Sequence, residues 1–160
     1  MKQKFADIKL FLKKIKNLSL GYNEIVFFDF EDLDQMQIGY RIDPDGRSLV
    51  SGNTEGWQEN WWVIAGDGIG DPIFVDVNFD NLAVLTAVHG QGSWDPVLIA
   101  DSLEGFAAIL AILHKTSRGR TDPVKLEKKP IPEIEKLEVL NAILKYNPDA
   151  DIEYWEMYLT

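Results

Sequence analysis

The chain has 160 residues, a length that fits one domain, and its 46% apolar and 26% charged residues lie near globular averages and argue against wholesale disorder. It contains no cysteine, which excludes disulfides and thiolate metal sites and favours a reducing compartment, so we expect a cytoplasmic protein. The formal net charge of −10 argues against direct nucleic-acid binding, and no apolar run or secretory pattern indicates a membrane partner.

The N-terminal segment, residues 1–16, predicts an amphipathic helix of about four turns. Its apolar residues recur at three- and four-residue spacing, and most of its lysines fall on the other face. Such a helix either packs on the domain with its lysines in solvent or lies on a membrane or in an acidic groove. The sequence favours packing and leaves additional binding open. The apolar residues are Phe5, Ile8, Leu12 and Ile15.

From Tyr22 the pattern changes to that of strands. Residues 24–30 are rich in β-branched and aromatic side chains, and residues 35–42 alternate between apolar and polar side chains. Residues 43–46 are Asp-Pro-Asp-Gly, which favours a turn because proline presets φ and glycine adopts a positive φ. With residues 47–51 as the returning strand, the sequence predicts a hairpin.

Further short apolar runs, each bounded by Gly, Asp or Asn, predict strands at 60–65, 72–77, 82–88 and 97–100. The connections between them are too short for crossover helices, so these strands should pair mostly antiparallel.

A helix with an apolar stripe is predicted to begin at Asp101 or Ser102, and Asp101 with Glu104 fits a capping box. Residues 114–132 contain Gly119, three prolines and a cluster of basic residues. This composition predicts a surface loop or linker rather than a core element.

Residues 133–160 are predicted to be a C-terminal helical extension. Its helix spans 133–146, with acidic residues early, Lys145 late and a stop at Asn147-Pro148. The fold class is therefore α+β, a mainly antiparallel sheet flanked by an N-terminal helix and two C-terminal helices, in one domain over 1–160. The residues of the last helix expected to face the domain are Ile134, Leu137, Leu140 and Leu144.

Motifs that would carry chemistry are few. His89, Ser93 and Asp95 are close in sequence, but a triad needs convergent geometry and Ser93 lacks a G-x-S-x-G context. The glycine-rich residues 66–72 lack G-x-G-x-x-G spacing and precede a strand, which favours a turn over a phosphate site. The aspartates of 43–46 and 66–72 do not continue into a calcium-binding loop. We therefore predict a non-catalytic protein without a cofactor or metal.

Five tryptophans are candidates for the core or for an interface. Trp61 and Trp62 would point to opposite faces of a strand, so one should pack in the core while the other meets solvent, a helix or a partner. Exposed tryptophan among acidic residues suits a protein interface, although burial is favoured for most of the five. They are Trp57, Trp61, Trp62, Trp94 and Trp155.

Four segments occur in a distinctive order: WVIAGD at 62–67, GDPIFVD at 70–76, VHG at 88–90 followed by Trp94, and IADSLEGF at 99–106. This series resembles the SUKH superfamily, which includes yeast cell-wall-synthesis regulators and many bacterial immunity proteins. The resemblance covers roughly residues 22–113. It implies an antiparallel sheet flanked by helices and a bacterial role in neutralising a cognate toxin, often a nuclease, by binding it. It brings no catalytic residues, and the absence of the Leu-Pro element common near the N-terminus marks a divergent member.

The acidic charge is concentrated where the resemblance falls. Residues 17–114 carry two arginines against sixteen acidic residues, a net charge of −14, between basic segments at 1–16 and 115–130. Such a field speeds association with a basic partner, and nuclease toxins tend to be basic. We therefore predict an immunity-type protein that neutralises a toxin domain; the alternative is a regulatory scaffold that binds cellular proteins.

Five residues are candidates for partner binding because they are acidic or aromatic and lie in turn-rich stretches. They are Glu55, Trp57, Glu59, Asp67 and Asp71. The identity of the partner and the oligomeric state stay open at this level.

Overall fold

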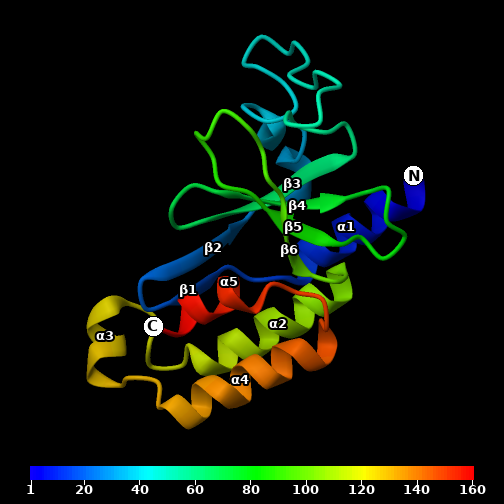
Figure 1. Ribbon diagram of the computed structural model, residues 1–160. Helices are drawn as coiled ribbons and strands as arrows, with labels where there is room; N and C mark the ends of the chain where they lie inside the picture. Colours follow the sequence, from blue (N-terminus) through cyan, green and yellow to red (C-terminus); the bar gives the residue numbers. More distant parts are fainter.

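The strands form one antiparallel sheet in which spatial order follows sequence order, in the computed structural model that describes residues 1–160 (Figure 1). Successive strands pair antiparallel, as predicted for the closely spaced strands, although two of the connections, 28–60 and 87–96, are long. The predicted α+β class is confirmed. The strands are β1 (Leu18–Leu20), β2 (Asn23–Phe27), β3 (Trp61–Asp67), β4 (Pro72–Asp76), β5 (Val84–Thr86) and β6 (Val97–Ala100).

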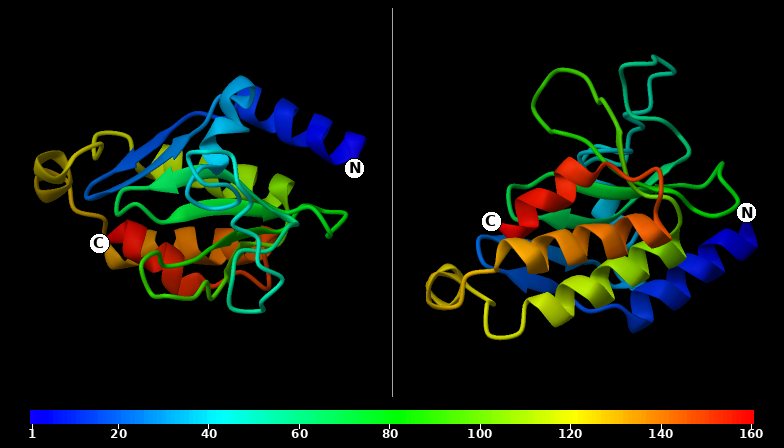
Figure 2. Two further views of the ribbon diagram at one scale, coloured as in Figure 1. Left: turned by 90° about the horizontal axis from the view of Figure 1, so that it is seen from above. Right: turned by 60° about the horizontal axis from the view of Figure 1, so that its bottom comes forward.

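Three long helices lie side by side on one face of the sheet (Figure 2). They are α1 (Lys2–Lys14), α2 (Leu103–Thr116) and α4 (Glu133–Tyr146), and none is long and apolar enough to span a membrane. The shorter helices are α3 (Pro123–Lys128) and α5 (Ile152–Glu156), with 3₁₀ turns η1 (Phe30–Asp32), η2 (Gln35–Gln37) and η3 (Met157–Leu159).

Helix α1 packs through the face that its apolar spacing predicts. Ile8 and Leu12 are buried in the main core, and Phe5 lies edge-on against Trp62 of β3 with ring centroids 4.9 Å apart. Lys4 donates to the carbonyl of Val77, so one lysine holds α1 to the sheet while most of the others are exposed. The contacts of α1 are those of a packing helix.

The opposite face of β3 carries a second, aromatic core. Trp61 is buried there, whereas its neighbour Trp62 faces α1, as alternation along a strand predicts. Long excursions over 28–60 and 87–96 contribute to this core and rise on the side of the sheet away from α2 and α4 (Figure 1). Its buried members are Trp57, Trp61, Val63, Phe74 and Ala87.

The predicted hairpin over 35–51 forms only next to its turn, where Ile42 and Ser48 make an isolated antiparallel bridge, and its first half is not a strand. Asp43 accepts the amide of Gly46 at 3.0 Å, and Gly46 has φ +81°. Instead of a strand, residues 35–37 form η2, because the side chain of Gln37 is buried and pairs with β3. Its amide oxygen accepts from Val63 N at 2.9 Å and its amide nitrogen donates to Val63 O at 2.9 Å. One side chain thus replaces the backbone of a neighbouring strand.

Residues 114–132 are not the surface loop that their composition predicts. They contain the end of α2 and all of α3, and Arg120, Leu126 and Ile131 are buried. The guanidinium of Arg120 donates to both carboxylate oxygens of Glu135, at 2.9 and 3.1 Å, and to two main-chain carbonyls at 2.8 and 2.9 Å. A buried arginine therefore ties this segment to α4.

The last predicted helix has the predicted bounds, but its buried face differs. Val139 and Ile143 are buried, whereas Ile134 and Leu137 are exposed, because α4 packs on α2 and α5 rather than on the sheet. Asn147 at its C-terminal end is fully buried and donates to the carbonyl of α2 residue 105.

The start of α2 is capped by Ser102, not by the predicted pair of Asp101 and Glu104. The Ser102 hydroxyl accepts the amide of Gly105 at 2.8 Å. A side chain at position 105 would collide with Asn147 Oδ1, so the contact between α2 and the end of α4 depends on glycine.

Candidate binding cleft

A cleft of about 370 Å³ lies between the β3–β4 turn, the adjacent ends of β5 and β6, and α5. Its walls come from segments far apart in the sequence, which the antiparallel sheet and the C-terminal helices bring together. The lining residues on the sheet side are Asp67, Ile69, Asp71, Thr86, Ala87, Val88 and Val97. Those on the C-terminal side are Asp151, Glu153, Tyr154 and Met157.

Asp67 organises the turn between β3 and β4. Its Oδ1 accepts the amides of Ile69 at 3.1 Å and Asp71 at 2.9 Å, and Gly70 has φ +89°. Burial raises the pKa of the Asp67 carboxyl, while the amides of Asp71 and Ile69 offset part of that rise. The turn therefore holds a half-buried carboxylate at the wall of the cleft.

Asp71 is buried at the base of the same turn and holds His89. Its Oδ1 accepts the backbone amide of His89 at 3.0 Å and lies 2.6 Å from His89 Nδ1. The His89 ring makes no hydrogen bond with Ser93 or Asp95, the two residues from which a triad would be assembled. The His89 loop is thus anchored to the cleft through Asp71.

Helix α5 supplies the facing wall. Asp151 caps it by accepting the amide of Glu153 at 3.0 Å, and the Asp151 amide donates to the carbonyl of Leu98 in β6 at 2.8 Å. The hydroxyls of Tyr154 and Tyr158 are 2.9 Å apart and buried behind this wall. Burial raises the pKa of both tyrosines, and the charge of nearby Asp67 adds to the rise. Both therefore stay neutral hydrogen-bonding groups at neutral pH.

The cleft combines negative charge with exposed apolar surface. Four carboxylates line it and no lysine or arginine does. Asp67, Asp151 and Glu153 form no ion pair anywhere in the chain. Uncompensated carboxylates beside aliphatic side chains suit a lysine or arginine, whose charged head and apolar stem need both surfaces. The exposed apolar residues are Ile69, Val88, Val97 and Met157, with Ile69 75% exposed.

The five nominated partner-binding residues fall into two groups. Asp67 and Asp71 lie together in the cleft. Glu55 and Glu59 are exposed on a separate segment, and Trp57 beside them is only 2% exposed because it fills the aromatic core. The ring of Trp57 is therefore a packing element and not an exposed anchor.

None of the five nominated residues lies in the α5 wall. The one available signal is the net charge of −5 over residues 131–160, which places seven acidic residues against two lysines near the C-terminus. No group of three or more histidine, aspartate or glutamate side chains, in the cleft or elsewhere, is arranged to hold a metal ion.

The variant Asp67→Asn is expected to keep the fold. Its free energy of unfolding, compared with that of wild type, should increase as the pH rises. Asparagine retains an oxygen that accepts the two turn amides, and it avoids burying a charge. Because the folded-state pKa of Asp67 is raised, the wild-type carboxyl contributes stability at low pH that is lost as the pH rises through that pKa. Urea unfolding between about pH 4 and about pH 7 should show the variant gaining on wild type; a constant difference would contradict the burial of this charge.

The chain matches no family model, no curated protein and no solved structure. Its similarity to the SUKH superfamily therefore stays a prediction from the sequence motifs, while the α+β fold rests on the structure.

Proposed function

We propose that the chain is a non-catalytic, immunity-type protein that binds and neutralises a cognate bacterial toxin domain with a basic surface, such as a nuclease. The observation that carries this proposal is the cleft with four carboxylates and no lysine or arginine. The motif series of residues 62–106 supplies the toxin as the class of partner, because immunity proteins are common in the superfamily it resembles.

Electrostatics supports binding at this cleft. A nuclease must hold a phosphate backbone, so its substrate surface carries lysine and arginine. Acidic side chains speed encounter with such a surface, and exposed aliphatic side chains around them add contact area once the basic side chains have entered. A protein bound there also blocks access of the nucleic acid.

The test is rescue of growth when the chain is coexpressed with a candidate toxin domain encoded by a neighbouring gene. Wild type should restore growth and co-purify with the toxin. Glu153→Lys, which reverses an exposed charge in the cleft, should lower affinity at least about tenfold and reduce rescue. Glu138→Lys makes the same charge change at an exposed site on α4 and should leave rescue unchanged.

A second pair of variants separates the cleft from general surface effects. Ile69→Arg places a positive charge on an exposed apolar position of the cleft, and Ile134→Arg does the same on α4. Only the first should prevent rescue, with both proteins showing wild-type thermal unfolding. Equal effects of the two members in both pairs would place the interface elsewhere. Tight binding to a cellular protein without rescue from any toxin would instead support a regulatory scaffold.

A further inference from the structure

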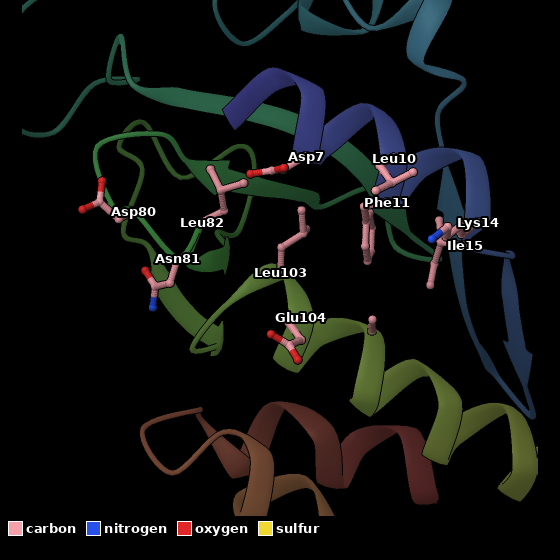
Figure 3. Close-up of a pocket in the computed structure, with 11 residues that line it drawn as sticks. Asp7, Leu10, Phe11, Lys14, Ile15, Asp80, Asn81, Leu82, Leu103 and Glu104 are labelled. Atoms are coloured by element: carbon pink, nitrogen blue, oxygen red, sulfur yellow. The ribbon is translucent and has the colours of Figure 1, made fainter. Parts of the chain in front are cut away.

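The acidic cleft and the groove between α1 and α2 differ in their charges. The groove, of about 650 Å³, is lined by Lys14 as well as by three carboxylates (Figure 3). One of these carboxylates, Asp80, is already paired with Lys4 at 3.3 Å. The cleft is lined by four carboxylates and by no lysine or arginine. Of the two hollows, only the cleft therefore indicates the charge of its ligand.

Asp67 is the carboxylate in the cleft that is left open for a partner. Its Oδ1 accepts the amides of Ile69 and Asp71, whereas its Oδ2 accepts no hydrogen bond and forms no ion pair. Oδ2 is nevertheless accessible, because the one unpartnered side-chain oxygen that is shut off from solvent belongs to Asp101. Asp71, by contrast, is held by the ring of His89 at 2.6 Å. The turn thus fixes the Asp67 carboxylate through one oxygen and leaves the other free.

A single free oxygen suits an ammonium group better than a guanidinium group. A guanidinium binds a carboxylate most strongly through two parallel hydrogen bonds that need both oxygens, as in the contact of Arg120 with Glu135. An ammonium group is a compact charge whose three N–H groups can each donate to a separate acceptor. Because the turn amides occupy Oδ1 of Asp67, we expect the cleft to prefer lysine to arginine.

The walls of the cleft suit the four-carbon stem of a lysine. Ile69, Val88 and Met157 line it and are exposed, and its volume of about 370 Å³ has room for one such side chain. Lysine packs its methylene groups along apolar surface of this kind while its charged end reaches a polar group. Burial also raises the pKa of Asp67, so its charged form is disfavoured in the free protein and an ammonium beside it would offset that cost.

We propose that the cleft is a lysine pocket, in which the ammonium of one partner lysine binds Asp67 Oδ2 while its stem packs on Ile69 and Met157. The inference rests on the proposed function for the identity of the partner, a toxin domain. It assigns different roles to two carboxylates of the same cleft. Glu153 is exposed and speeds encounter, whereas the half-buried Asp67 holds the bound lysine and slows its release.

The first experiment needs no toxin. Its probe is Nα-acetyl-lysine amide, added at about 1 to about 100 mM to the isotope-labelled full chain. The NMR signals of Asp67 and Ile69 should shift and saturate, whereas the uncharged norleucine analogue should not shift them. The arginine analogue should bind at least about threefold more weakly. Cleft signals that do not respond to the lysine compound, or equal binding of the arginine compound, would overturn the proposal.

Two asparagine variants locate the ammonium. Asp67→Asn removes the charge but keeps an oxygen for the turn amides, and it should abolish the shifts caused by the lysine compound. Asp34→Asn makes the same change at an exposed position that forms no ion pair, and it should leave those shifts unchanged. Binding that persists in Asp67→Asn would refute the role of Asp67.

The second experiment measures rates with the toxin domain. Asp67→Asn should accelerate dissociation at least about tenfold and change association by less than about threefold, whereas Glu153→Lys should chiefly slow association. Equal dissociation rates of Asp67→Asn and Asp34→Asn would contradict the proposal. Binding of the lysine compound without rescue from any toxin would keep the lysine pocket and remove the proposed function. Full rescue and unchanged dissociation with Asp67→Asn would do the reverse.

Discussion

Replacing Trp57 with alanine is expected to lower the free energy of unfolding by about 3–5 kcal/mol. The Trp57 ring contacts Trp61, Phe74 and Trp94, with ring centroids 4.8 to 5.4 Å apart. Its indole nitrogen donates to the carbonyl of Trp61 at 3.2 Å. Truncation would therefore leave a large cavity under the 28–60 excursion and remove the residue around which the second core is arranged.

Glu55→Ala in the same segment is the matched control for Trp57→Ala. Glu55 is exposed, so its truncation should change the free energy of unfolding by no more than about 0.5 kcal/mol. Urea unfolding followed by tryptophan fluorescence and by circular dichroism measures both variants. Similar stabilities of the two variants would mean that the aromatic core does not stabilise the domain.

Arg120→Ala is expected to cost about 3–5 kcal/mol of stability. The Arg120 side chain is only 6% exposed, and its removal leaves Glu135 and the carbonyls of Thr116 and Lys129 without their donor. A partly buried carboxylate and two carbonyls without partners are penalised, because solvent cannot replace the lost hydrogen bonds fully. Thermal unfolding should show a single transition at a lower temperature.

Arg118→Ala provides the comparison. It removes the same charge two residues earlier in the chain, at a position that is exposed. It should lie within about 0.5 kcal/mol of wild type. Lysine at position 120 should rescue only part of the loss, since one ammonium group cannot reproduce the planar two-oxygen contact with Glu135. Full rescue by lysine would show that charge alone matters at this site.

The elements that depend on local pattern were predictable. Strands β3, β4 and β6 coincide closely with the short apolar runs at 60–65, 72–77 and 97–100. Helix α4 has the predicted bounds because its acidic start, basic end and Asn-Pro stop are all encoded within or next to it. Alternation also placed Trp61 and Trp62 on opposite faces of β3.

In two of the mispredicted regions, a polar side chain makes distant hydrogen bonds. Gln37 pairs with Val63, 26 residues away, and this pairing overrides the alternating pattern that predicted a strand. Arg120 pairs with Glu135, 15 residues away, and turns a Pro- and Gly-containing basic segment into a packed one. Neither contact leaves a periodic trace in the sequence, since each depends on a single residue.

The candidate site also consists of one part that is encoded locally and one part that depends on contacts between distant residues. Asp67 and Asp71 were identified because the turn that contains them is local. The facing wall, with Asp151 and Glu153, arises only when α5 packs against β6 through contacts such as that of the Trp155 indole with the Ile99 carbonyl at 2.8 Å. No local pattern near the C-terminus encodes this juxtaposition. The acidic net charge predicted the chemistry of the site, but not its location.

The association rate of the purified chain with the proposed toxin domain, measured from about 50 to about 500 mM salt, tests the acidic cleft most directly. Wild type should associate at least about tenfold more slowly at the higher salt concentration, because salt screens the attraction between opposite charges. Glu153→Lys should already be slow at low salt, while Glu138→Lys should behave like wild type. A rate that does not depend on salt, or equal slowing by the two substitutions, would contradict binding through this cleft.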